Sequence, residues 1–212
     1  GLKQDVAYMY CDSAVLLQPE NMFEAYGNVR VIQSDTVRIN GKELFYSGDE
    51  RVFTIKKDVL LTTPSSRLAT TVLRYDRNNA TAYYLTRSTL ERKTLRLTSD
   101  FGSYNTDIDL VKLQGDVVAV DSSFLMNTDT LLYYPKRNMY DFAGPTKMVR
   151  DSTTLYCQLG TYEADKTLLR LEGGASMISP RQFIKASTLT YNLNINSGEL
   201  LGQGLVADTA QG

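Results

Sequence analysis

Apolar and polar positions along the chain repeat with a period of 29 residues. The clearest marker is a short apolar-x-Tyr motif, whose tyrosine serves as the anchor of each repeat. Six anchors follow one another at this spacing, and an earlier copy at Leu16 lies one residue out of phase. A fixed period of roughly 20–50 residues is typical of stacked repeat proteins. The anchors are Tyr46, Tyr75, Tyr104, Tyr133, Tyr162 and Tyr191.

Within each repeat, the spacing of apolar residues predicts strands rather than helices. Apolar residues stand seven, nine, thirteen and fifteen positions after the anchor. This alternation with period two is the signature of a β-strand with one apolar face. Polar turn sequences such as residues 47–50 follow the anchor, and no segment has helical periodicity. We therefore expect an all-β chain in which each repeat contributes two strands of about ten residues.

A two-stranded repeat cannot bury its apolar face alone, so neighbouring repeats are expected to stack and share one core. We expect seven repeats over residues 2–212, forming a single open-ended β-domain that advances by about 4.8 Å per repeat. Five of the seven residues at position eleven after the anchor are glycines, which mark bends or bulges in strands. These bends favour a V-shaped cross-section. The glycines are Gly27, Gly115, Gly144, Gly173 and Gly202.

Composition and charge exclude several classes of function. The 23 Lys and Arg residues nearly balance 24 Asp and Glu residues, so no global field attracts nucleic acid. The chain has no histidine, which removes the usual base of a nucleophilic triad and the commonest zinc ligand. Carboxylate pairs such as Asp107 with Asp109 fall in predicted turns and occupy no fixed column. We therefore expect no enzyme activity, no metal site and no cofactor.

The two cysteines occupy one column of the repeat. Cys11 and Cys157 each stand five residues before an anchor, five repeats apart. With one strand spacing per repeat, their separation is about 24 Å. A disulfide requires Cα atoms within roughly 7 Å, so we expect none between them.

Several segments resemble the OstA-like proteins, in the form found in Bacteroidetes. This family includes LptA and the amino-terminal domain of LptD, which act in lipopolysaccharide transport. The resemblance rests on an alternating strand that ends in a Gly-Asn-Val or Gly-Asp-Val sequence, and on a Leu-x-Tyr motif before a polar turn. The matching segments are residues 12–14, 23–31, 68–76, 82–84 and 112–117.

The resemblance implies a slightly twisted, open-ended β-jellyroll that holds the lipid A acyl chains of lipopolysaccharide between its two sheets. It implies a periplasmic protein, associated with the outer membrane, that carries lipid without chemistry. Its partners would be other Lpt-type jellyroll proteins or further copies of itself, joined end to end, and not nucleic acid. The chain is expected to be a fragment of a longer secreted protein. An LptA-like bridge and an LptD-like amino-terminal domain both remain open.

The resemblance also favours a lipid groove over an ordinary core for the apolar columns. Without it, the same columns predict a plain solenoid core, and the alternative function is a structural or adhesive β-solenoid that binds proteins or glycans. The anchor tyrosines favour a stacked ladder at the edge of the sheet over a carbohydrate site. The residues expected to line the groove are Phe23, Phe53, Ile55, Tyr84, Val111, Leu113, Tyr140, Phe142, Leu169 and Leu171.

Overall fold

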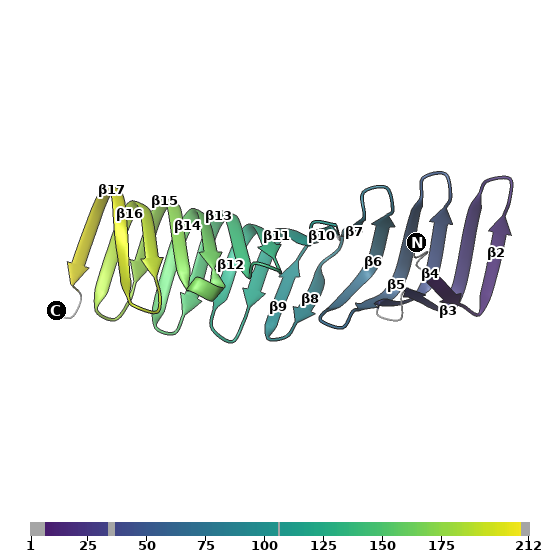
Figure 1. Cartoon of the computed structure of the whole chain (residues 1–212), viewed down its shortest axis with the longest axis horizontal. Helices are drawn as coiled ribbons and strands as arrows, with labels where there is room; N and C mark the ends of the chain where they lie inside the picture. Colours follow the sequence, from purple (N-terminus) through teal and green to yellow (C-terminus); the bar gives the residue numbers. More distant parts are fainter. Residues whose placement is uncertain (1–6, 34–36, 106, 209–212) are drawn as a thin grey trace, which may run out of the picture. The chain divides into compact units, whose positions relative to one another are not determined.

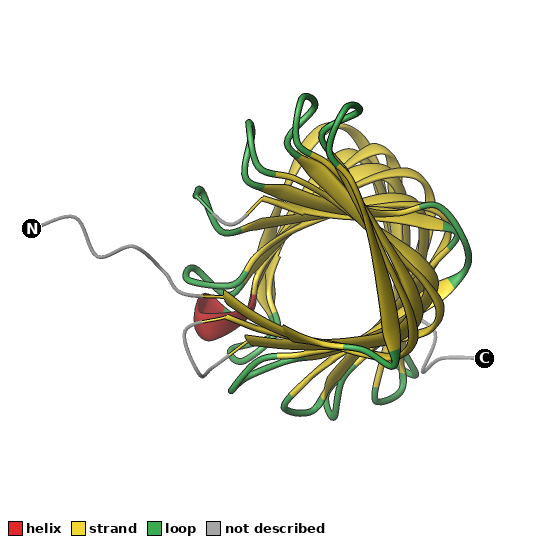
Figure 2. Cartoon of the chain, turned by 90° about the vertical axis from the view of Figure 1, so that its right-hand side faces the viewer, coloured by secondary structure: helices red, strands yellow, loops and turns green. Residues whose placement is uncertain are grey.

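The computed structural model describes residues 7–33, 37–105 and 107–208, almost all of them in strands (Figure 1). One short 3-10 helix, η1 (Ala164–Lys166), interrupts the strands in this part of the chain (red in Figure 2). None of the described helices is long and apolar enough to cross a bilayer. The expected all-β class is confirmed. The chain divides into two compact units, Gly1–Ile108 (unit 1) and Asp109–Gly212 (unit 2).

Unit 1 is an antiparallel meander in which each long strand pairs with the next one along the chain. The first two strands both pair with β3, one along each half of it. The last two long strands are each broken in the middle, so that β6 pairs with β7 and then β8. Its strands are β1 (Ala7–Tyr10), β2 (Ser13–Leu17), β3 (Met22–Gln33), β4 (Val37–Ser47), β5 (Val52–Thr62), β6 (Arg67–Asp76), β7 (Thr81–Tyr84), β8 (Ser88–Arg92), β9 (Leu95–Ser99) and β10 (Phe101–Asn105).

Unit 2 is a regular meander of long antiparallel strands (teal to yellow in Figure 1). Each strand pairs with its neighbour in sequence through to the last strand. Its strands are β11 (Leu110–Val120), β12 (Leu125–Tyr134), β13 (Met139–Arg150), β14 (Thr153–Glu163), β15 (Leu168–Ile178), β16 (Gln182–Asn192) and β17 (Ser197–Asp208).

This pairing corrects the expected spacing of the repeats. Both strands of a repeat lie side by side in the same sheet, for example β13 against β14 and then β15. One repeat therefore advances by two strand spacings, about 9.6 Å, and not by the single spacing of about 4.8 Å. The separation of about 24 Å estimated for Cys11 and Cys157 rested on that single spacing, and the two residues lie in different units. Both cysteines are free.

Bulges in β11, β13, β15 and β17 divide the long strands of unit 2 into two halves. The pairing register shifts there, as between Gln114 and Val117 or between Ala143 and Thr146. The column that stands eleven residues after the anchor adopts positive φ at this point, which glycine tolerates best. The glycine column therefore marks the bend, as expected. Positive φ is found at Gly27, Lys57, Gly115, Gly144, Gly173 and Gly202.

The repeat also governs the turns that follow the anchors. The last residue of each of these turns adopts a left-handed backbone conformation, with φ between 46° and 57°. This conformation suits asparagine and glycine but costs other residues about 1–2 kcal/mol. The residues in this column are Asn21, Arg51, Ala80, Asp109, Asn138, Thr167 and Asn196.

We expect Ala80→Gly to raise the free energy of unfolding by about 0.5–1 kcal/mol, because glycine adopts the φ of 49° at this position without a steric penalty. Urea denaturation followed by circular dichroism measures the change. The matched control is Ala69→Gly, at an exposed position inside β6, which should lower stability by a similar amount. A loss of stability in both variants would contradict the assigned turn.

Candidate lipid-binding interior

The buried face of unit 2 consists of ladders of side chains that run across successive strands. On one side of the bulge, cross-strand partners form a tyrosine ladder and, beside it, a leucine ladder. The tyrosine ladder is Val111, Tyr133, Tyr140, Tyr162, Leu169 and Tyr191, and the leucine ladder is Leu113, Leu131, Phe142, Gly160, Leu171 and Leu189.

On the other side of the bulge, a methionine ladder lines the buried face. Met126, Met148 and Met177 are each at most 1% exposed. Methionine is flexible and polarisable, so it fills irregular apolar space more readily than branched residues do. The full ladder is Ala119, Met126, Met148, Leu155, Met177 and Ile184.

Small side chains occupy the corner between the two halves. Thr128 and Thr146 are buried, and their hydroxyl oxygens lie 2.8 Å apart. Each hydroxyl has one hydrogen, so Thr146 donates to the carbonyl of Gly144 at 2.9 Å, and Thr128 shares its hydrogen between the Thr146 oxygen and the carbonyl of Ala143 at 3.1 Å. Both buried hydroxyls therefore have hydrogen-bond partners within the protein.

An aromatic clasp closes the buried face of unit 2 on the side opposite the corner. Phe124, in the turn between β11 and β12, packs edge-on against Tyr140 and Tyr162, with ring centroids 5.7 Å apart in both cases. Tyr140 in turn stacks on Tyr133 at 4.8 Å and on Tyr162 at 6.0 Å. Arg150, in the end of β13, donates from Nη1 to the Tyr162 hydroxyl at 3.3 Å. The clasp therefore joins the methionine half to the tyrosine ladder.

Unit 1 has the same two ladders, but its aromatic ladder is more accessible. Phe53 pairs with Tyr46 on one side and with Tyr75 on the other, and its ring lies 5.2 Å from that of Tyr75. These three side chains are half-buried, whereas Tyr140 and Tyr162 are 2% exposed. Beside them, the core positions Ile55 and Leu73 are fully buried. Unit 1 thus offers the more accessible apolar surface of the two.

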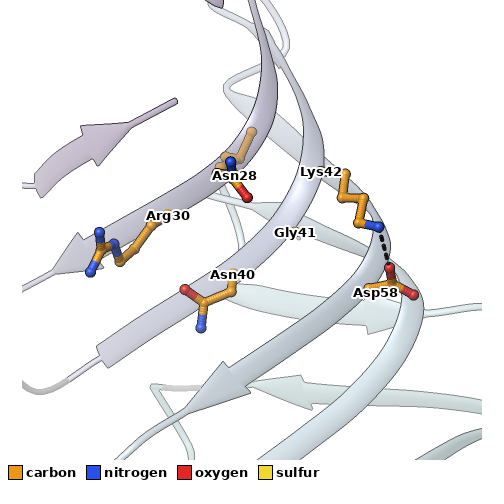
Figure 3. Close-up of a pocket in the computed structure, with 7 residues that line it drawn as sticks. Asn28, Arg30, Asn40, Gly41, Lys42 and Asp58 are labelled. Atoms are coloured by element: carbon orange, nitrogen blue, oxygen red, sulfur yellow. Dashed lines mark ion pairs between the residues drawn. The ribbon is translucent and has the colours of Figure 1, made fainter. Parts of the chain in front are cut away.

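A polar pocket of about 270 Å³ lies on β4 between the bulges of β3 and β5 (Figure 3). Arg30 and Lys42 bring two cations to it, and the Lys42 ammonium pairs with the Asp58 carboxylate at 2.9 Å. Asn28 and Asn40 add amide donors and acceptors. The pocket carries a net positive charge and suits a polar or anionic group.

The structure buries eight of the ten residues predicted to line a groove, while Phe23 and Phe53 are half-buried. Each of these eight therefore faces the interior of its own unit, and whether they bind lipid stays a prediction. Sequence reasoning missed the other half of the leucine ladder, which includes Leu131 and Leu189. The apolar residue of the apolar-x-Tyr motif could have predicted these positions. A residue two before a buried anchor lies on the same face of the strand. The anchors Tyr133 and Tyr162 each stack on Tyr140, which lies between them in the ladder, and their rings are buried in the interior and not at the edge of the sheet as expected.

Burial raises the pKa of several interior acids. It raises the pKa of the Cys157 thiol to about 12, against a lowering contribution from its hydrogen bond with Thr146. It also raises the pKa of the Tyr140 hydroxyl, helped by Tyr133 and Asp121. The interior therefore favours neutral groups. Among the described residues, no group of three or more potential ligands is placed to hold a metal ion.

The raised pKa of Cys157 predicts a loss of stability at alkaline pH. The unfolded thiol ionises near pH 9, whereas the folded thiol stays protonated to about pH 12. Folded chains then bind more protons than unfolded ones, so the free energy of unfolding falls as the pH rises through this window. Urea midpoints at pH 8 and pH 10.5 should differ less in Cys157→Ala than in the wild type. An unchanged difference would contradict the burial of the thiol.

Comparison with known proteins matches the chain to solved structures and to one protein-family model. One solved structure is LptH of Pseudomonas aeruginosa, the LptA-homologous periplasmic component of the lipopolysaccharide transport device of that organism. Its TM-score is 0.48 at 13% identity, and the match covers 52% of this chain and 83% of LptH. No curated protein matches the chain. A family model described as OstA-like protein matches residues 1–129, which is more than half of the 212 residues. The chain therefore belongs to the OstA-like protein family, as its repeat motifs indicated.

Proposed function

We propose that this protein is a non-catalytic periplasmic carrier that holds the acyl chains of lipopolysaccharide and passes them towards the outer membrane. The observation that carries the proposal is the set of apolar ladders, which continue from strand to strand within each unit. In the described residues, no buried side-chain nitrogen or oxygen lacks a hydrogen-bond partner. The interior therefore presents no polar anchor at which a lipid would stop.

Apolar surface alone supplies enough affinity for such a ligand. Burial contributes about 25 cal/mol per Å² of apolar surface, so several acyl chains bind tightly without hydrogen bonds. Neighbouring positions of each ladder have similar apolar side chains. An acyl chain that moves along the ladder by one strand therefore loses one set of apolar contacts and gains a similar one. Such an interior supports binding together with sliding, which a carrier needs and an enzyme does not.

Unit 1 provides the accessible part of this surface. The half-buried rings of Phe23, Phe53 and Tyr75 are the natural first contacts for an acyl chain. Arg30 and Lys42 line the polar pocket at the bulges of the same unit (Figure 3). Guanidinium and ammonium groups bind phosphates well. The pocket lies on the outward face of these strands, because Arg30 and Lys42 are exposed while their neighbours Val29 and Gly41 are buried, so it suits an anionic group that contacts the sheet from outside.

The end of unit 2 supports the proposed end-to-end partners. β17 pairs with β16, and its other side faces no strand of unit 2 (yellow in Figure 1). Leu201, Leu205 and Val206 of this strand are each 56% exposed. An exposed apolar edge strand is a template for strand addition. A second Lpt-type jellyroll, or another copy of this chain, would extend the sheet here.

A structural or adhesive β-solenoid is the second candidate. The observation that favours it is the filled interior of unit 2, where Leu113, Leu131 and Leu169 are fully buried by their neighbours. A solenoid that displays loops has a closed core of normal density. This candidate predicts that lipid does not enter.

Native mass spectrometry after incubation with lipopolysaccharide separates the two candidates, with a detergent-matched control. The carrier should show adducts of lipid mass that decrease at least tenfold in Phe53→Asp. Phe53 is half-buried, so this change leaves the core more intact than a substitution at the fully buried Leu113 or Phe142. Thr54→Asp, at the next position of β5 on the opposite face, is the matched control. Absence of adducts from the folded wild type would support the solenoid.

A further inference from the structure

An apolar row runs across the outward face of unit 2, on the methionine half and next to the turns. Its members are successive cross-strand partners from β11 to β17. Val120, Leu125 and Ile178 are 40–44% exposed, and the others are partly exposed. We call this set the outer apolar row: Val120, Leu125, Val149, Thr154, Ile178, Phe183 and Ala207.

A second row, between the outer apolar row and the bulge, carries the charge of this face. Its two charged residues are Lys147 and Lys185, both exposed, and it contains no carboxylate. The Lys147 ammonium lies 6.0 Å from the ring centre of the exposed Tyr156. We call it the lysine row: Val118, Asn127, Lys147, Tyr156, Ser176, Lys185 and Leu205.

The fold itself does not require an apolar row at this place. The same columns of the repeat in unit 1 form an outward row with four charged side chains, which is an ordinary solvated edge. Unit 2 therefore departs from a pattern that the same repeat satisfies elsewhere with charges. The row in unit 1 is Tyr8, Ile32, Arg38, Thr62, Arg67, Glu91 and Arg96.

A pocket of about 320 Å³ opens beside the lysine row, next to the bulges of β13 and β15. Lys147, Asn127 and Tyr156 line one side of it, and the backbone at Gly173 and Gly174 lines the other. It has the size of a small polar head group and contains a cation and hydrogen-bonding groups. From the turns towards the bend, this face therefore carries the outer apolar row, then the lysine row, and then the pocket.

We propose that this face of unit 2 docks on the surface of an anionic phospholipid bilayer. The outer apolar row enters the boundary between head groups and acyl chains, and Lys147 and Lys185 lie at the level of the phosphates. Tyr156 belongs at the same level, where aromatic side chains with polar tips are enriched. The pocket takes one phospholipid head group.

The dimensions of the row favour a bilayer over a protein partner. Seven strands at about 4.8 Å make a row about 30 Å long, and one residue of width gives an apolar area of roughly 200 Å². A stable protein interface needs about 800 Å² on each side. A fluid lipid surface accepts a narrow apolar row, because lipids rearrange around it. Arg150 and Arg181 near the turns face Asp121, Asp151 and Asp208, and Asp116 and Asp129 lie towards the bulge, so the positive charge of this face is concentrated in the lysine row.

Vesicle flotation tests the proposal with the full chain. The vesicles contain phosphatidylethanolamine and phosphatidylglycerol at three to one, without lipopolysaccharide, so the result does not depend on lipid carriage. The wild type should float with them, and Leu125→Glu combined with Ile178→Glu should reduce the bound fraction at least tenfold. Lys147→Gln combined with Lys185→Gln should reduce it severalfold and weaken the dependence on salt.

The matched control is Leu159→Glu, at a 51% exposed leucine on the outward face of the other half of β14. It should float like the wild type. Three results would overturn the proposal: wild-type protein that stays below the vesicles, row variants that float normally, or equal losses in the row variants and Leu159→Glu. Uptake of single lipids into the interior does not make a protein float, so it cannot imitate the expected result.

Discussion

Phe124→Ala is expected to lower the free energy of unfolding by about 3–5 kcal/mol, as is typical when a buried phenylalanine is truncated. The ring is 5% exposed although it lies in a turn, because it packs against Tyr140 and Tyr162. Its loss leaves a cavity and uncovers the stacked tyrosines. Guanidinium denaturation followed by circular dichroism gives the stability. Hydrogen exchange should show faster opening of the turn between β11 and β12.

Two variants separate packing from other effects at the clasp. Leu201→Ala removes an exposed side chain and should change stability by no more than about 0.5 kcal/mol. Tyr162→Phe removes the hydroxyl that accepts from Arg150 and should cost about 0.5–1.5 kcal/mol. If Phe124→Ala proves as mild as Leu201→Ala, the clasp does not close unit 2.

The second large effect is expected for Gly144→Ala, which should lower the free energy of unfolding by about 2–4 kcal/mol. Gly144 has φ of +90°, where a side chain is strained. A Cβ at this position would also lie 2.7 Å from the Cβ of Asp129. That contact involves the rigid base of the aspartate side chain, so relief requires movement of the backbone of β12 or β13. Urea denaturation measures the loss.

Gly174→Ala is the matched control for this effect. Its φ of +83° is similar, but a Cβ there would have no atom within 4 Å. The control should therefore show the conformational cost alone, about 1–2 kcal/mol. The difference between the two variants measures how closely the strands approach at the bulge. Equal losses would mean that Asp129 moves away freely.

Much of the fold follows from the period of the sequence. The anchors and the columns after them define the strands, because a side chain two positions away returns to the same face. The glycine column predicts the bulges, and Lys57 adopts positive φ in that column without glycine. Thr86 is the exception, since the strand breaks at this point between β7 and β8. A local pattern therefore predicts local geometry well.

Features that depend on contacts between distant parts were not predictable in this way. The sequence period does not distinguish one strand spacing per repeat from two, because both place the same columns on one face. Phe124 stands in the turn between β11 and β12, and its contact with Tyr162 crosses from one half of the unit to the other. The outer apolar row could not be predicted from the alternation of inward and outward positions along the strands. Leu125 and Ile178 occupy outward positions, which are expected to be polar.

In the candidate site, too, the local pattern predicts some features and contacts between distant residues determine others. Period two places Ile55, Leu113 and Leu171 inside correctly, as their burial shows. The period-two alternation does not predict the distance between the two halves of a unit, because that distance depends on the geometry of the bulges and on the aromatic clasp. The difference between the half-buried Phe53 and the buried Tyr140 therefore needed the structure. This difference makes unit 1 the better place to look for lipid.

Site-specific photocrosslinking tests most directly whether acyl chains enter the interior. A photoreactive phenylalanine analogue replaces Phe53 or Phe142 on the buried face, and Thr54 or Asp141 on the outward face of the same strands. After irradiation with lipopolysaccharide, adducts should form at Phe53 and Phe142 and be at least tenfold weaker at the two outward positions. Equal labelling on both faces, or labelling of the outward face alone, would contradict the carrier account.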